Sequence, residues 1–183
     1  DWDTGLTGGI QATGNYPGKA RNMSELLMDL DKALSLIPGE LKVNVHAIYL
    51  DNKAGKADRN QITPHHFAAW ADWAVEKRIG LDFNPTFFSH PKSTGYTLAS
   101  PEPEIRQFWI EHGKACRKIG EFFGRKTGKC CITNIWVPDG EKENPYDAMA
   151  PRQRLMESLD EILREPIDPA FNKDAVESKL FGM

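Results

Sequence analysis

The stretch DAVESKLFG at 174–182 decides the fold of this sequence. It has the length and apolar content of a strand, and side chains along a strand alternate between the two faces of a sheet. Glu177 and Lys179 therefore share one face. Burying a glutamate and a lysine under the helices of an open sheet would be costly. In a barrel the same face points to the mouth, where functional sites lie, so the stretch favours a barrel.

Three other predicted strands repeat this pattern. They are KVNVHAIYL (42–50), GLDFN (80–84) and CCITNIWV (130–137). Alternation groups polar or aromatic residues on one face toward the end of each strand. These shared faces carry Asn44, His46 and Ile48 on the first strand, Asp82 and Asn84 on the second, and Asn134 and Trp136 on the third. All four strands thus bring candidate functional side chains to the same end of one sheet.

Helical periodicity fills the intervals between these strands. The predicted helices cover about 23–36, 64–78, 101–123 and 151–164, the third with Ser100 as N-cap and Pro101 in its first turn. Alternating helices and strands predict a parallel sheet with crossover helices. We therefore expect an α/β fold, a partial TIM-type (β/α)8 barrel of about four strand–helix units, as a single domain over 1–183. A whole barrel needs about 250 residues, so length alone would better suit an open doubly wound sheet.

Charge, hydropathy and cysteine content argue against several classes of partner for this protein. The net charge is -3 with no basic stripe, which argues against nucleic acid, and no apolar run approaches the roughly 18 residues of a membrane span. Cys116, Cys130 and Cys131 are expected to be buried thiols of a cytoplasmic protein rather than disulfides or zinc ligands. The glycine-rich segment 8–21 lacks the spacing of a phosphate-binding loop, and the chain has no dinucleotide fingerprint.

Glu177 and Lys179 have two interpretations. They are either a salt-bridged pair at a strand end, or a metal ligand beside a cation that polarises a substrate oxygen. His46 is similarly either a core histidine or a substrate contact. Trp136 is either core or a flat wall against which a sugar ring packs. The loops 85–99 and 138–149 follow the second and third strands, where α/β proteins place their sites.

Seven longer blocks carry a family resemblance. They are TGGIQATGNYPGKARN (7–22), VHAIYL (45–50), LDFNPTFFSHP (81–91), IRQFWIEH (105–112), NIWVPDG (134–140), APRQRL (150–155) and AVESKLFG (175–182). Together they resemble the L-rhamnose isomerase family over essentially the whole chain. The resemblance implies a cytoplasmic (β/α) barrel enzyme, usually tetrameric, that interconverts L-rhamnose and L-rhamnulose. It also implies a divalent metal, with manganese (Mn2+) expected first and zinc (Zn2+) or cobalt (Co2+) as alternatives.

The resemblance also implies roles for individual residues. Glu177 matches a structural-metal ligand, and Lys179 matches the lysine that contacts the reacting oxygens of the sugar. The residues matched to the sugar pocket are His46, Trp136, Phe87 and Phe88, with the choice between the two phenylalanines left open. The implied reaction moves hydrogen between C1 and C2 of the opened sugar, as a hydride or through an enediol.

The family's other metal ligands have no counterpart in this sequence. Family members are much longer, and the missing ligands would lie beyond Met183. We therefore expect a fragment of the enzyme that is catalytically silent alone. The competing hypotheses are a structural half-barrel module and a non-catalytic sugar-binding protein.

Overall fold

The computed structural model describes residues 17–143 and 146–179. The predicted strand end at 180–182 and most of the glycine-rich segment 8–21 therefore lie outside the described residues.

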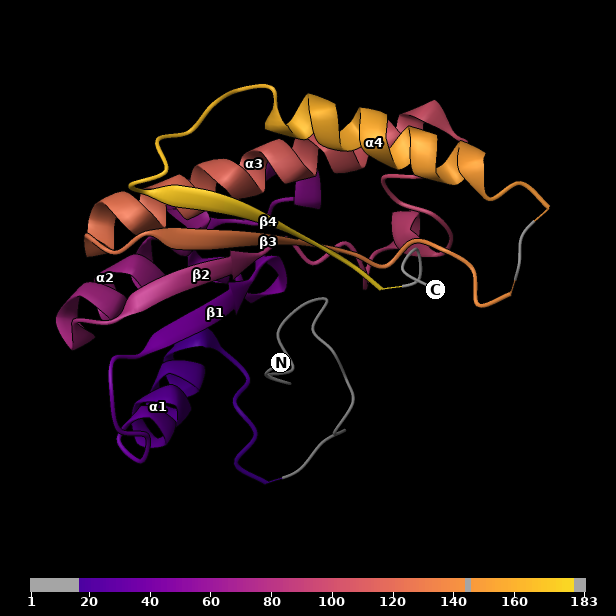
Figure 1. The fold of residues 1–183 in the computed structure, drawn as a ribbon. Helices are drawn as coiled ribbons and strands as arrows, with labels where there is room; N and C mark the ends of the chain where they lie inside the picture. The colour runs from indigo at the N-terminus through magenta and orange to yellow at the C-terminus, as the bar shows by residue number, and fades with distance from the viewer. Residues whose placement is uncertain (1–16, 144–145, 180–183) are drawn as a thin grey trace.

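One four-stranded parallel sheet organises the chain, in the order β1-β2-β3-β4 (Figure 1). The strands are β1 (Lys42–His46), β2 (Gly80–Asn84), β3 (Cys131–Val137) and β4 (Asn172–Ser178). The α-helices are α1 (Met23–Leu34), α2 (Ala68–Lys77), α3 (Pro103–Thr127) and α4 (Met149–Leu163). Short 3-10 helices are η1 (Ala47–Tyr49), η2 (Asn52–Ala54), η3 (Arg59–Gln61), η4 (Pro64–Phe67) and η5 (Pro91–Ser93). The predicted α/β fold is confirmed for these four strands, and closure into a barrel stays a prediction.

The first strand is shorter than predicted. β1 ends at His46, and the chain turns into the 3-10 helix Ala47–Tyr49. Ile48 in this turn is buried, and the Tyr49 carbonyl accepts a hydrogen bond from Trp70 Nε1 at 2.9 Å. The prediction that Ile48 shares a strand face with His46 is therefore wrong. The strand ends before Ile48 because the 3-10 turn that contains Ile48 packs against α2.

The third helix begins two residues later than predicted. Pro103, not Pro101, occupies the first turn, and Glu102 is the N-cap with extended backbone (φ -83°, ψ 113°). A residue that precedes proline is disfavoured in the helical region, which explains why Glu102 stays outside the helix. Ser100 is therefore not the N-cap, although its Oγ accepts a hydrogen bond from Glu102 N at 3.2 Å.

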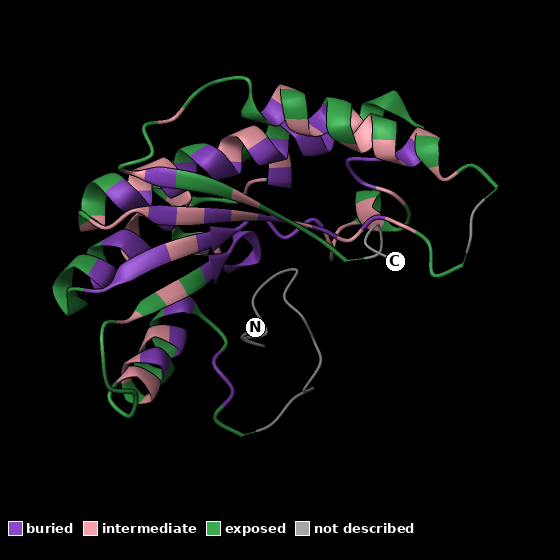
Figure 2. Ribbon diagram, in the orientation of Figure 1, coloured by how far each residue is buried: buried purple, intermediate pink, exposed green. Residues whose placement is uncertain are grey.

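The two faces of the sheet have different environments. Along β3 the side chains alternate between buried and half-buried, with Trp136 and Asn134 among the half-buried ones. The buried face lies against α3, which contacts β2, β3 and β4. Figure 2 shows the same alternation of buried and intermediate residues along β3. We call the half-buried side, which carries Trp136, the open face, and the side against α3 the packed face.

Two apolar clusters form the core. One joins α1, α2, β1 and β2, with Trp70 and Phe83 fully buried, and the other gathers Phe87, Trp109 and Ile135 between the loops and α3. Cys116 and Cys131 are buried as predicted, and Cys130 is half-buried. In the described part of the chain, no helix is both long and apolar enough to span a membrane.

Candidate functional site

A continuous row of side chains runs across the carboxyl ends of the strands. His46 ends β1, Phe88 lies in the loop after β2, Trp136 lies near the end of β3, and Lys179 directly follows β4. The ring centres of His46 and Phe88 are 6.5 Å apart, and those of Phe88 and Trp136 are 5.2 Å apart in an edge-to-face arrangement. Lys179 Nζ lies 5.1 Å from the centre of the Trp136 ring. Parallel pairing in sequence order thus unites four predicted site residues, which we call the site row.

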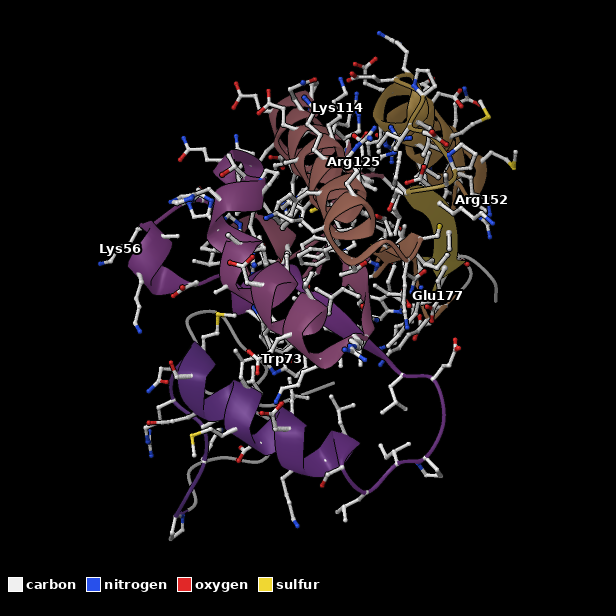
Figure 3. All side chains as sticks on the ribbon, turned by 90° about the vertical axis from the view of Figure 1, so that its left-hand side faces the viewer. Lys56, Trp73, Lys114, Arg125, Arg152 and Glu177 are labelled. Carbon is white, nitrogen blue, oxygen red and sulfur yellow. The ribbon has the colours of Figure 1, made fainter. Side chains whose placement is uncertain are left out.

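Glu177 lies beside this row. It pairs in register with Trp136, so both side chains are on the open face. Its Oε2 accepts a hydrogen bond from Asn134 Nδ2 at 2.8 Å, and its side chain is exposed near β4 in Figure 3. The ion pairs of the described residues do not include one between Glu177 and Lys179. Among the described residues, the Glu177 carboxylate is therefore paired with the Asn134 amide and not with Lys179.

His46 is held at the buried end of the row. It is 4% exposed, its Nδ1 lies 3.1 Å from Thr86 Oγ1, and its ring packs against Tyr49. Burial lowers the pKa of His46 to about 4, because the charged ring would lose its hydration. The ring is therefore neutral at pH 7.

Phe87 and Phe88 point to different sides. Phe87 is fully buried and packs against Trp109 and His112 of α3, with ring centres 5.5 and 5.4 Å away. Phe88 is half-buried and lies between His46 and Trp136. Of the two alternatives, the structure places Phe88 in the site row and Phe87 in the core.

Sequence reasoning missed the residues that hold the loop after β2. Thr86 is fully buried and has φ +59°, a backbone region that β-branched residues rarely adopt. The Thr86 N–H donates to Asn84 Oδ1 at 2.9 Å. His112 Nε2 lies 2.5 Å from the carbonyl oxygen of Pro85, so a side chain of α3 holds this loop in place. No local sequence motif indicates these contacts, since His112 fits the apolar stripe of its helix.

Asp139, also missed, connects the two longer loops. Its carboxylate accepts hydrogen bonds from the Thr97 N–H, the Thr97 hydroxyl and the Ala99 N–H, each at 2.7 Å. The side chain is 3% exposed, and burial raises the pKa of its carboxyl while the three donors oppose that shift. Asp139 therefore fixes the segment near residue 97 to the end of β3.

Two hollows differ in their relation to the row. A cavity of about 240 Å³ lies at the outer edge of β1, lined by residues that include Asn44, His46 and Trp70. A larger one of about 490 Å³ lies in the helix layer, near Lys114 and Arg125 of α3 (Figure 3). The larger hollow is lined by none of the predicted site residues, and the smaller one includes His46.

Metal ligands are sparse in this part of the chain. Over 17–143 and 146–179, no group of three or more His, Cys, Asp or Glu side chains is placed to hold a metal ion. Glu177 offers carboxylate oxygens, the donor type that hard divalent cations prefer. Among the described residues, Glu177 thus fits such an ion as one ligand of an incomplete set.

The fold and the row together define an α/β protein with aromatic and charged side chains converging at the carboxyl ends of parallel strands. The model of the family described as L-rhamnose isomerase (RhaA) matches residues 2–183. The L-rhamnose isomerase of Mannheimia succiniciproducens is 59% identical over 97% of this chain, which corresponds to 42% of that protein. Those of Cronobacter sakazakii and Listeria monocytogenes are 59% and 58% identical over 97% and 99% of this chain, each alignment covering 43% of the relative.

The chain therefore belongs to the L-rhamnose isomerase family, and the predicted resemblance is confirmed. It spans about two fifths of the length of the relatives that it matches.

Proposed function

We propose that this chain is part of a metal-dependent aldose–ketose isomerase that interconverts L-rhamnose and L-rhamnulose. Its four strands then form one side of a (β/α)8 barrel, with the open face toward the barrel axis. The observation that supports this most directly is the site row, because a single strand end from each of four consecutive units contributes to it. Membership of the L-rhamnose isomerase family supplies the reaction.

The aromatic residues of the row bind the sugar. The edge-to-face contact between Phe88 and Trp136 forms an apolar corner against which a ring face or a methyl group packs. His46, neutral at pH 7, hydrogen-bonds a sugar hydroxyl. These contacts orient the substrate and exclude water from its apolar side.

Lys179 is the catalytic residue of this chain. Its ammonium group stabilises negative charge that develops on the reacting oxygens of the sugar. The Lys179 ammonium nitrogen lies 5.1 Å from the centre of the Trp136 ring, and this cation–π contact positions the cation before the sugar binds.

Glu177 is a metal ligand. The Asn134 amide binds Oε2, which orients the carboxylate as outer partners of metal ligands commonly do. Glu177 would help to hold a divalent ion, Mn2+ first or alternatively Zn2+ or Co2+, which would supply stabilisation of negative charge on the sugar oxygens. The remaining ligands come from the part of the enzyme that this chain does not contain.

Substitution of Glu177 and Lys179 in the full-length protein tests these roles. Lys179→Met should keep the metal but lower turnover by about two to three orders of magnitude, as for loss of one oxyanion stabiliser. Glu177→Gln should lower metal content and activity together. Lys173→Met, on the same face of β4 but at its far end, is the matched control and should change neither. Metal loss in Lys179→Met, or near-normal turnover, would contradict the assignment.

The 183-residue chain alone should be catalytically silent. A divalent ion prefers about four to six ligands, whereas this chain contributes Glu177. Stoichiometric manganese after extensive dialysis of the isolated chain, or measurable rhamnose turnover, would disprove this. The full-length enzyme is proposed to be a cytoplasmic homotetramer, which light scattering on the purified protein tests.

A further inference from the structure

The hydroxyl of Thr86 lies between two groups. Thr86 Oγ1 is 3.1 Å from the carbonyl oxygen of Asn84 and 3.1 Å from Nδ1 of His46. A hydroxyl group has one hydrogen to donate and two lone pairs that accept. A carbonyl oxygen only accepts, so the Thr86 hydrogen is directed to Asn84. Its oxygen then faces His46 as an acceptor.

This arrangement determines which ring nitrogen of His46 carries hydrogen. If the hydroxyl donated to Nδ1 instead, two oxygen atoms would face each other at 3.1 Å with no hydrogen between them. Both contacts are satisfied together only when Nδ1 of His46 carries the proton. Since His46 is neutral, Nε2 then has the lone pair and is the acceptor of the ring.

The backbone shows that Thr86 is held in this place. Its φ of +59° is unfavourable for a β-branched residue, and such strain persists where the surrounding structure enforces it. Asn84 Oδ1 binds the Thr86 N–H, and His112 contacts the preceding carbonyl of Pro85. The hydroxyl is therefore fixed relative to β1 as well as β2.

We propose that Thr86 is a positioning residue that fixes the Nδ1–H tautomer of His46, so that Nε2 accepts a hydrogen bond from a hydroxyl group of the substrate. The sugar contact rests on the function proposed above, whereas the tautomer does not. Charged or titratable groups near His46 include Arg59 from η3 and Tyr49 from η1.

Two matched substitutions separate the hydroxyl from the shape of the side chain. Thr86→Ser keeps the hydroxyl and removes a methyl group, and Thr86→Val keeps the branching and removes the hydroxyl. Nitrogen chemical shifts of 15N-histidine, measured by solid-state NMR on the full-length protein without sugar, report the tautomer. His46→Gln identifies the signal. If Thr86→Val does not fold, Thr86→Ala removes the same hydroxyl.

The wild type and Thr86→Ser should show protonated Nδ1, and Thr86→Val should shift His46 toward the Nε2–H form. KM for L-rhamnose should rise about tenfold in Thr86→Val, with kcat changed less, and stay within about twofold in Thr86→Ser. A wild-type His46 protonated at Nε2, or an unchanged tautomer in Thr86→Val, overturns the proposal. A changed tautomer with an unchanged KM supports the role of Thr86 and counts against His46 as a sugar contact.

Discussion

The packed and open faces of the sheet are made by the same strands but differ in burial. On the packed face, α3 approaches so closely that a Cβ at Gly124 would lie 1.9 Å from the Phe171 carbonyl oxygen, and one at Gly120 2.3 Å from Thr133 Oγ1. On the open face, Trp136 is half-buried and Glu177 is exposed. Successive residues of β3 therefore alternate between the buried core and the half-buried open face. Substitutions one residue apart should have effects of different kinds.

Gly124→Ala should have the largest effect. The added methyl group would overlap backbone atoms of Phe171, which cannot rotate away as a flexible side chain can. We expect the full-length protein to lose at least about 3 kcal/mol of unfolding free energy, measured by urea denaturation.

Gly95→Ala is the control for this change, because an added Cβ there has no neighbour within 4 Å. It should leave the unfolding free energy nearly unchanged. A loss below about 1 kcal/mol in Gly124→Ala would show that α3 can move away from the sheet without cost.

Ile135 and Trp136 test the two faces at adjacent positions of β3. Ile135 is fully buried on the packed face, so Ile135→Ala should cost about 2–4 kcal/mol of stability and leave KM for L-rhamnose nearly unchanged. Trp136→Ala should cost less stability but raise KM about tenfold, equivalent to about 1.4 kcal/mol of binding. Steady-state kinetics and urea denaturation on both variants of the full-length protein give the comparison. Equal KM values for L-rhamnose in the two variants would show that Trp136 does not contact the sugar.

Much of this contrast could be predicted from the sequence. Period-two alternation alone placed Trp136 and Asn134 on one face, and Glu177 on the same side of the next strand. The contacts of Asp139 and His112 could not be predicted, because they join residues 42 and 27 positions apart in the chain. The end of β1 was mispredicted for a similar reason: HAIYL suits a strand locally, and only its tertiary packing turns it.

Acid should weaken the fold through His46. Its pKa is about 4 when folded and near 6.5 when unfolded, so between these values the unfolded chain binds more protons. The stabilisation from neutral His46 is thus complete above about pH 6.5 and is lost as the pH falls toward 4. At about 1.4 kcal/mol per pKa unit, we expect a loss of about 1–3 kcal/mol. Urea denaturation against pH measures it, and His46→Gln should flatten the curve; an equally steep curve in that variant would assign the effect elsewhere.

Substitution of Val176 should have the smallest effect on the stability of the isolated chain. It also gives the sharpest test of the proposal that the four strands are part of a barrel. Its place in β4, paired with Ile135, assigns it to the packed face, yet it is 51% exposed. Ile135 is thus covered within a cluster that includes Trp109 of α3 and Ile162 of α4, whereas the adjacent position on the edge strand is open to solvent. In a barrel that continues past β4, the following helix would cover this position, as α3 covers β3.

Val176→Lys should therefore behave differently in the two proteins. In the isolated chain, a surface substitution should change the unfolding free energy by no more than about 0.5 kcal/mol. The open edge of β4 should let the isolated chain self-associate, and the lysine should reduce this association because a charged residue on an edge strand opposes edge-to-edge pairing. In the full-length protein the buried ammonium would be costly, and we expect a loss of at least about 2 kcal/mol. Urea denaturation and light scattering on both proteins measure these effects. A small change in both would mean that no helix covers β4, and the sheet would then end as an open edge rather than continue as a barrel.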